Sequence, residues 1–271
     1  MKLLAVFVLF CSLFLFAAEN KVLKMGYRTN EKLPFIEKAP SDEGFYKDFY
    51  MEVAKRMGYK LEIIRSSKMR INEGLENGSI DFYPYYSFDN DRVKYSVWVN
   101  LWFENQHVAI TVSSAKDLNT INDIKGLTQL ESLGNANYFE GYDISGVKKN
   151  EVPELNVERA LKLLELGRGD FYVYEKDILL YYLKKGNLTN FKIHKNLLPK
   201  KTYYYAGFST KSPLFESENN PNYDQSKPLS EENMPIIPKK DSPVHKFQEV
   251  IKEMKNDGFT DKLYKKYFGE L

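Results

Sequence analysis

The chain has almost no cysteine. Its single thiol, Cys11, lies in an apolar N-terminal run, MKLLAVFVLFCSLFLFAA. This run has the length and layout of a secretory signal peptide, so we expect residues 1–18 to be removed after export. Phe10 is too bulky for the position before a lipidated cysteine. The mature protein would then have no disulfide and no zinc–thiolate site, which fits a bacterial periplasmic protein.

The chain also lacks a marked net charge and the common catalytic motifs. Its 39 Lys and Arg residues nearly balance its 37 Asp and Glu residues. A nucleic-acid-binding protein would gather basic residues on one face, so we expect no nucleic-acid partner. The three histidines, His107, His194 and His245, have no metal-ligand spacing, and no G-x-S-x-G, P-loop or G-x-G-x-x-G motif occurs. We therefore expect no metal, no cofactor and no enzymatic activity.

Apolar periodicity along the chain alternates between strand and helix. An alternation of this kind predicts an α/β fold with mostly parallel sheets flanked by helices. The tract 211–243 is rich in proline and predicts a long surface loop or a partly ordered insertion. The expected strands are 21–28, 60–65, 79–86, 109–114, 127–132, 170–175 and 203–210, and the expected helices are 45–57, 69–78, 156–167, 177–186 and two after 243, separated at Gly258.

One sequence motif occurs twice in the chain in similar form. Residues 75–86 read LENGSIDFYPYY, and residues 164–175 read LELGRGDFYVYE. Each motif ends a helix, turns at a glycine and begins a strand. Asp81 and Asp170 hold the same place in both and are expected to bond nearby backbone amides. Ligands of parallel sheets bind beyond the carboxyl ends of the strands, so the residues that follow each motif are candidates for a binding site.

The chain resembles the bacterial extracellular solute-binding proteins of family 3, the amino-acid-binding type with the type II periplasmic binding protein fold. Six segments carry the resemblance in the right order and cover nearly all of the mature chain. They are KMGYRTNEKLPF, GFYKDFYMEVAKRMGYKLEI, LENGSIDFYPYYSFDNDR, INDIKGLTQLESLGNAN, ALKLLELGRGDFYVYEKDI and FQEVIKEMKNDGFTDKLYKKYF.

The resemblance implies two lobes with a ligand cleft between them. Lobe 1 would comprise residues 19–110 plus 206–271, and lobe 2 residues 111–205. Two crossing strands, near 109–114 and 204–210, would join the lobes. The implied function is capture of a small amino-acid-like or carboxylate ligand, by a monomer, for a membrane permease or a sensor.

The resemblance also implies how the ligand is held. Arg92 matches an arginine that grips the ligand α-carboxylate, and its planar guanidinium suits that task. Ser87 matches a supporting hydroxyl. Glu175 stands where the family has an aspartate for the α-amino group. The alternatives are that Arg92 is a surface residue paired with Asp89 or Asp91, and that Glu175 is simply exposed.

Further candidates come from the same alignment of motifs. Asn135 lies where the family receives the carboxylate at a helix start. Arg70 matches an arginine of some branches and could add a second anion contact. Tyrosines and a tryptophan at strand ends predict an aromatic pocket wall. These aromatic candidates are Tyr27, Tyr85, Tyr86, Trp102 and Tyr138.

Two other functions remain open on the same fold. Relatives of the family include periplasmic dehydratases, in which a cleft carboxylate is a general acid, and Glu175 among aromatics could take that role. The third reading is an orphan sensing receptor, which would use the same cleft without transport and would need a membrane partner.

Overall fold

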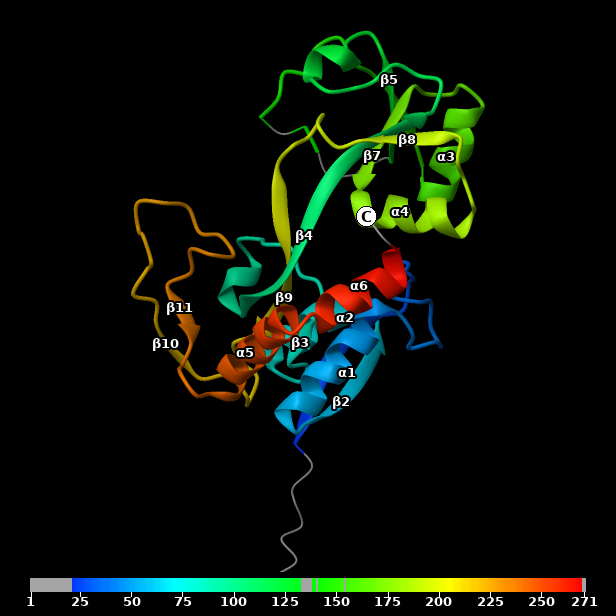
Figure 1. Ribbon diagram of the computed structural model, residues 1–271. Coiled ribbons are helices and arrows are strands. Elements are labelled where there is room, and N and C mark those ends of the chain that lie inside the picture. Colours follow the sequence, from blue (N-terminus) through cyan, green and yellow to red (C-terminus); the bar gives the residue numbers. More distant parts are fainter. Residues whose placement is uncertain (1–20, 133–137, 140, 154, 270–271) are drawn as a thin grey trace, which may run out of the picture.

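The computed structural model describes residues 21–132, 138–139, 141–153 and 155–269. Two lobes are joined by two long strands, β4 (Ser96–Val112) and β9 (Lys201–Ser209), which run side by side from one lobe to the other (Figure 1). The expected signal peptide, residues 1–18, lies outside the described residues. Within the described ranges, no helix is long and apolar enough to span a membrane.

The first lobe has a parallel core, with β1 between β2 and β3, to which β9 and β4 add antiparallel strands. Helices from both ends of the chain pack on this sheet, so the C-terminal pair returns to the lobe where the chain begins (Figure 1). The elements are β1 (Val22–Arg28), α1 (Phe45–Met57), β2 (Lys60–Ser66), α2 (Lys68–Asn77), β3 (Phe82–Tyr83), a 3₁₀ turn (Arg92–Lys94), α5 (Pro243–Asn256) and α6 (Phe259–Phe268).

The second lobe repeats this plan. Its parallel core has β5 between β6 and β7, and the far half of β4 pairs antiparallel with both β7 and β8. The elements are a 3₁₀ turn (Ile121–Ile124), β5 (Thr128–Ser132), β6 (Lys148–Val152), α3 (Val157–Glu165), β7 (Phe171–Glu175), α4 (Lys176–Lys185) and β8 (Phe191–His194). Both lobes therefore have the mixed α/β architecture that the sequence predicts.

Three expected elements differ from the structure. The strand predicted over 79–86 is only β3, because Pro84 has no amide to donate to a ladder. The strand predicted over 109–114 is the end of the 17-residue β4. The tract 211–243 contains a small antiparallel pair, β10 (Ser217–Asn219) and β11 (Ile236–Pro238). The lobe limits at 110 and 206 stay a prediction, since β4 and β9 belong to both lobes.

The repeated motif forms the same joint in each lobe. The Asp81 amide donates to the Lys24 carbonyl, and the Lys24 amide donates back to the Asp81 carboxylate at 2.7 Å. Asp170 makes the same two-way contact with Thr128, at 2.8 and 2.6 Å. The expectation that both aspartates bond nearby backbone amides is confirmed. Each one fixes a strand start against its neighbour.

Most of the aromatic side chains fill the core. The rings stack or meet edge to face, which adds to the free energy of burial. The fully buried ones include Tyr27, Tyr46, Tyr50, Tyr86, Tyr172, Tyr204, Phe35, Phe45, Phe49, Phe82, Phe139 and Phe171. Part of the tyrosine excess is therefore a structural feature.

The crossing strands are irregular where they pass between the lobes. The pairing of β4 with β9 changes register between Asn100 and Glu104. Within this bulge Trp102 has a φ of 58°, a conformation that bulky side chains rarely adopt, and its amide donates to the Asn100 side chain. A bulge bends the strand and weakens the ladder locally, which marks these residues as the place where the lobes could rotate.

Asp177 ties the second lobe to the first. It lies in the first turn of α4, is 1% exposed, and accepts hydrogen bonds from Tyr264 of α6 and from Tyr204 of β9. Burial raises the pKa of this carboxyl from its ordinary 3.8 to about 6, although the Tyr264 hydroxyl and the Lys176 ammonium act the other way. The contact between α4 and α6 thus depends on a buried acid.

This acid predicts a pH dependence of stability. Because its pKa is higher in the folded chain than in the unfolded chain, its contribution is complete below about pH 3.8 and is lost as the pH rises to about 6. Asp177→Asn keeps the neutral form at every pH. Relative to this variant, the wild type should lose about 2–3 kcal/mol of unfolding free energy between pH 4 and 6.5.

Urea unfolding at the two pH values measures this difference. Glu73→Gln, on the exposed face of α2, controls for the loss of one acidic group. A gap between wild type and Asp177→Asn that is the same at pH 4 and 6.5 would contradict the assignment.

Candidate functional site

Glu175 lies between the two lobes at the end of β7. It pairs with His107 of β4 in the sheet and is 8% exposed. Its Oε1 accepts a hydrogen bond from Lys32 Nζ at 3.1 Å and from the Tyr85 hydroxyl at 3.4 Å, both in the first lobe. Among the described residues, its Oε2 is buried and has no hydrogen-bond partner. This carboxylate therefore links the lobes and keeps one oxygen available.

Lys32 lies on the loop that follows β1. Its backbone pairs with Ile36 in a short antiparallel bridge, which fixes the loop. The ammonium of Lys32 lies 4.2 Å from the centre of the Tyr85 ring, a cation–π contact, besides its ion pair with Glu175. The sequence did not single out Lys32, because a lysine before Leu-Pro in a polar loop looks like a solvent-exposed residue.

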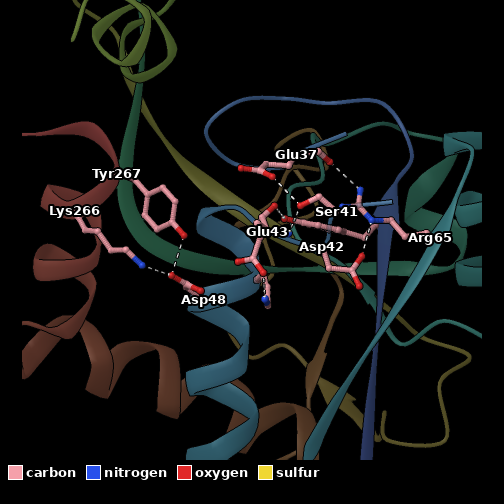
Figure 2. A network of polar contacts seen from close by, with 10 residues as sticks. Glu37, Ser41, Asp42, Glu43, Asp48, Arg65, Lys266 and Tyr267 are labelled. Atoms are coloured by element: carbon pink, nitrogen blue, oxygen red, sulfur yellow. Dashed lines mark hydrogen bonds and ion pairs between the residues drawn. The ribbon is translucent and has the colours of Figure 1, made fainter. Parts of the chain in front are cut away.

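A polar network holds this loop in place (Figure 2). Arg65 of β2 bonds the Asp42 carboxylate at 2.8 Å and the Glu37 carbonyl at 3.1 Å. Nearby, Asp48 of α1 accepts from Lys266 and Tyr267 of α6, at 2.6 and 2.8 Å. Arg65 thus holds the loop against β2, and the contacts of Asp48 hold α1 against α6. Lys32 is therefore presented to Glu175 by a loop that is anchored at several points.

Arg92 lies in the 3₁₀ turn after β3. Its Nη1 donates to the carbonyl and the hydroxyl of Ser87, at 2.8 and 3.0 Å, and its guanidinium lies 4.4 Å from the centre of the Tyr86 ring. Within the described part of the chain it forms no ion pair with Asp89 or with Asp91, whose carboxylate pairs with Lys94. Arg92 is therefore oriented by neutral groups and keeps its charge uncompensated.

Only some of the other predicted site residues lie in the region of Glu175. Tyr85 joins Glu175, and Tyr138 stacks on His107 at 4.3 Å, so both belong to the same region. Tyr27 is fully buried and donates to the Phe35 carbonyl, so it packs in the core and lines no ligand surface. Arg70 is exposed on α2 and forms no ion pair among the described residues. Asn135 lies outside the described residues.

The remaining aromatic candidates for the pocket wall, Tyr86 and Trp102, lie in different places. Tyr86 is buried beneath Arg92. Trp102 is 40% exposed and meets Tyr203 edge to face at the bulge in the crossing strands. Tyr174 lies on the other side of Glu175, and its pKa is raised by burial and then by the Glu175 charge. The aromatic neighbours of the carboxylate thus come from both lobes.

Two cavities adjoin the neighbours of Glu175. One, of about 330 Å³, is lined from the first lobe by Arg28 and Lys32 and from the second by Tyr174. The other, of about 370 Å³, is lined by His107 and Tyr138. Burial lowers the pKa of His107, while the Glu175 charge acts against this. Each cavity has the volume of a small-molecule site.

Metal binding finds no support in the described ranges. No group of three or more His, Cys, Asp or Glu side chains lies close enough together there to hold an ion. What the geometry offers is a carboxylate on one lobe and cations on the other. That arrangement suits a small ligand with groups of both charges.

Comparisons with known proteins show which proteins this chain is similar to. The L-cystine-binding protein TcyA of Bacillus subtilis is 25% identical over 228 residues, which cover 84% of this chain and 73% of TcyA. The open, unliganded L-cystine solute receptor of Neisseria gonorrhoeae has a TM-score of 0.65 at 21% identity, over 93% of this chain and 94% of the receptor.

A third similar structure is the GluR0 ligand-binding core of Nostoc punctiforme in complex with L-glutamate. Its TM-score is 0.60 at 17% identity, over 92% of this chain and 100% of that one. These structures share the two-lobe fold. The family model for bacterial extracellular solute-binding proteins, family 3, matches residues 23–270, and the chain therefore belongs to that family.

Proposed function

We propose that this protein is a periplasmic solute-binding protein, which captures a small amino-acid-like or carboxylate ligand between its lobes and delivers it to an ABC transporter. The observation that carries the proposal is the contact of Glu175, from one lobe, with Lys32 and Tyr85 from the other. A ligand between the lobes would bind groups that already face each other there. The bulge near Trp102 supplies a hinge for closure.

The ligand would be held by opposite charges at its two ends. Arg92 binds the α-carboxylate through its guanidinium, which Ser87 and Tyr86 already orient. Glu175 accepts the α-ammonium on Oε2, while Oε1 keeps Lys32. Only the closed form brings both charges onto one ligand, so binding favours closure.

The partners of the closed form are a membrane permease or, as the alternative, a sensor. Transport is supported by a similar structure, the substrate-binding protein of an amino acid ABC transporter, with a TM-score of 0.56. The protein would act as a monomer, exported by the signal peptide at residues 1–18.

An enzymatic role is less well supported. A dehydratase would need Glu175 as a general acid, which must carry a proton to donate. The ion pair of Glu175 with Lys32 at 3.1 Å uses the carboxylate form instead. The site is therefore better suited to binding than to acid catalysis.

Thermal-shift screening with amino acids and small carboxylates tests the binding function. A ligand at 100 times its Kd should add about 2.7 kcal/mol to the free energy of unfolding. Arg92→Ala should weaken binding of that ligand by about 10- to 100-fold, because it removes charge-assisted hydrogen bonds. Lys94→Ala, two residues later in the same 3₁₀ turn and exposed, should leave binding unchanged. If no amino acid or carboxylate shifts the transition, the proposal is wrong.

The role of Glu175 predicts a difference between paired ligands. The wild type should bind an amino acid more tightly than the same acid without its amino group, by about tenfold or more, since a charged hydrogen bond is lost. In Glu175→Gln this preference should nearly disappear. Isothermal titration calorimetry measures both affinities. An unchanged preference in the variant would show that the ammonium binds elsewhere.

A further inference from the structure

Three cations gather where the strands of the first lobe end. Arg28 is the last residue of β1 and pairs in register with Ser66, the last residue of β2. Lys68 follows two residues later and begins α2. Because parallel strands end at the same edge of a sheet, Arg28 and Lys68 lie at one edge. Arg92 lies in the turn that follows β3, the strand on the other side of β1.

The pKa directions of two groups agree with this placement. The pKa of the Lys68 ammonium is lowered, first by burial and then by the positive charges of Arg92, Arg28 and Lys32. The pKa of Tyr83 is raised by burial, and Arg28 and Arg92 act against this rise. Lys68 is only partly shielded, and enough of its surface stays in solvent for a ligand to reach it.

Arg28, Lys68 and Arg92 lack ion pairs with acidic side chains in the part of the chain that the structure describes. Glu31 lines the same cavity as Arg28. Its charge helps to raise the pKa of Tyr182, which belongs to the second lobe. Glu175 lies on the opposite lobe, and its Oε1 is already paired with Lys32.

Helix α2 begins with a cation, although a negative charge would be more favourable at a helix N-terminus. A helix N-terminus carries a partial positive charge and favours acidic residues, yet the first turn of α2 contains none and begins with Lys68. The same N-terminus attracts an anionic ligand group. The buried, unpartnered Oε2 of Glu175 is the second sign that a ligand belongs in this region.

We propose that the ligand carries a second acidic group, and that Arg28 and Lys68 bind it. This inference rests on the proposed function, in which Arg92 takes the α-carboxylate and Glu175 the ammonium. The four cations, Lys32 included, outnumber the two nearby carboxylates, Glu31 and Glu175, so a ligand without net charge would leave an excess of positive charge uncompensated. The cavity of about 330 Å³ lined by Arg28 leaves room for an acidic side chain.

Matched pairs of amino acids test the proposal by isothermal titration calorimetry at pH 7. The acids are L-aspartate, L-glutamate and L-2-aminoadipate, and each is compared with its side-chain amide, which has nearly the same shape. At least one acid should bind about tenfold or more tightly than its amide, because the amide makes no charge-assisted hydrogen bond. In the double variant Arg28→Gln/Lys68→Gln this preference should fall below about threefold.

The double variant Lys55→Gln/Lys60→Gln is the control. It removes the same charge from exposed positions of the first lobe, Lys55 on α1 and Lys60 at the start of β2, away from the carboxyl ends of the strands, and should keep the preference. Circular dichroism checks folding, and the single variant Lys68→Gln replaces the double one if that fails to fold. The inference would be overturned if the amides bind as tightly as the acids, or if the preference survives in Arg28→Gln/Lys68→Gln. Either result would leave the proposed function standing. If no amino acid binds, the proposed function itself fails.

Discussion

The carboxylate of Glu175 is almost fully removed from water between the two lobes, and a buried charge is costly unless it is paired. Its partners, Lys32 and Tyr85, come from the opposite lobe. The relative position of the lobes therefore affects the free energy of this one group directly. The anchored loop of Lys32 holds one of its partners in place, and the pairing of β7 with β4 fixes its backbone. Its Oε2 is buried and has no hydrogen-bond partner among the described residues.

The short segment from Glu175 to Asp177 connects the site to the scaffold. Glu175 faces Lys32 and Tyr85, whereas Asp177, two residues later, faces Tyr264 of α6 and Tyr204 of β9. One strand–helix junction thus contacts the first lobe on two sides. A ligand that moves Glu175 would act on a segment whose other end is fixed.

Much of the scaffold could be predicted from periodicity and from the repeated motif, because both report local backbone preferences. Helix α1 has the bounds that its apolar spacing predicts, and the Asp81 and Asp170 joints are as expected. The full length of β4 does not follow from periodicity, because polar residues between Asn100 and His107 interrupt its apolar pattern. Partners distant in the chain do not follow either: Lys32 meets Glu175 across 143 residues, and Arg28 and Lys68 come to one edge only once β1 and β2 are aligned. Tyr27 was assigned to the pocket, but its side chain turns into the core.

The central claim is that the lobes enclose a small acidic ligand that also carries an ammonium. Mass spectrometry of the small molecules released when the purified protein is denatured tests this most directly. We predict a compound with two acidic groups and one amine, present with the wild type and depleted at least about tenfold with Arg92→Ala. A bound compound without a carboxylate, or one retained equally by Arg92→Ala, would contradict the account.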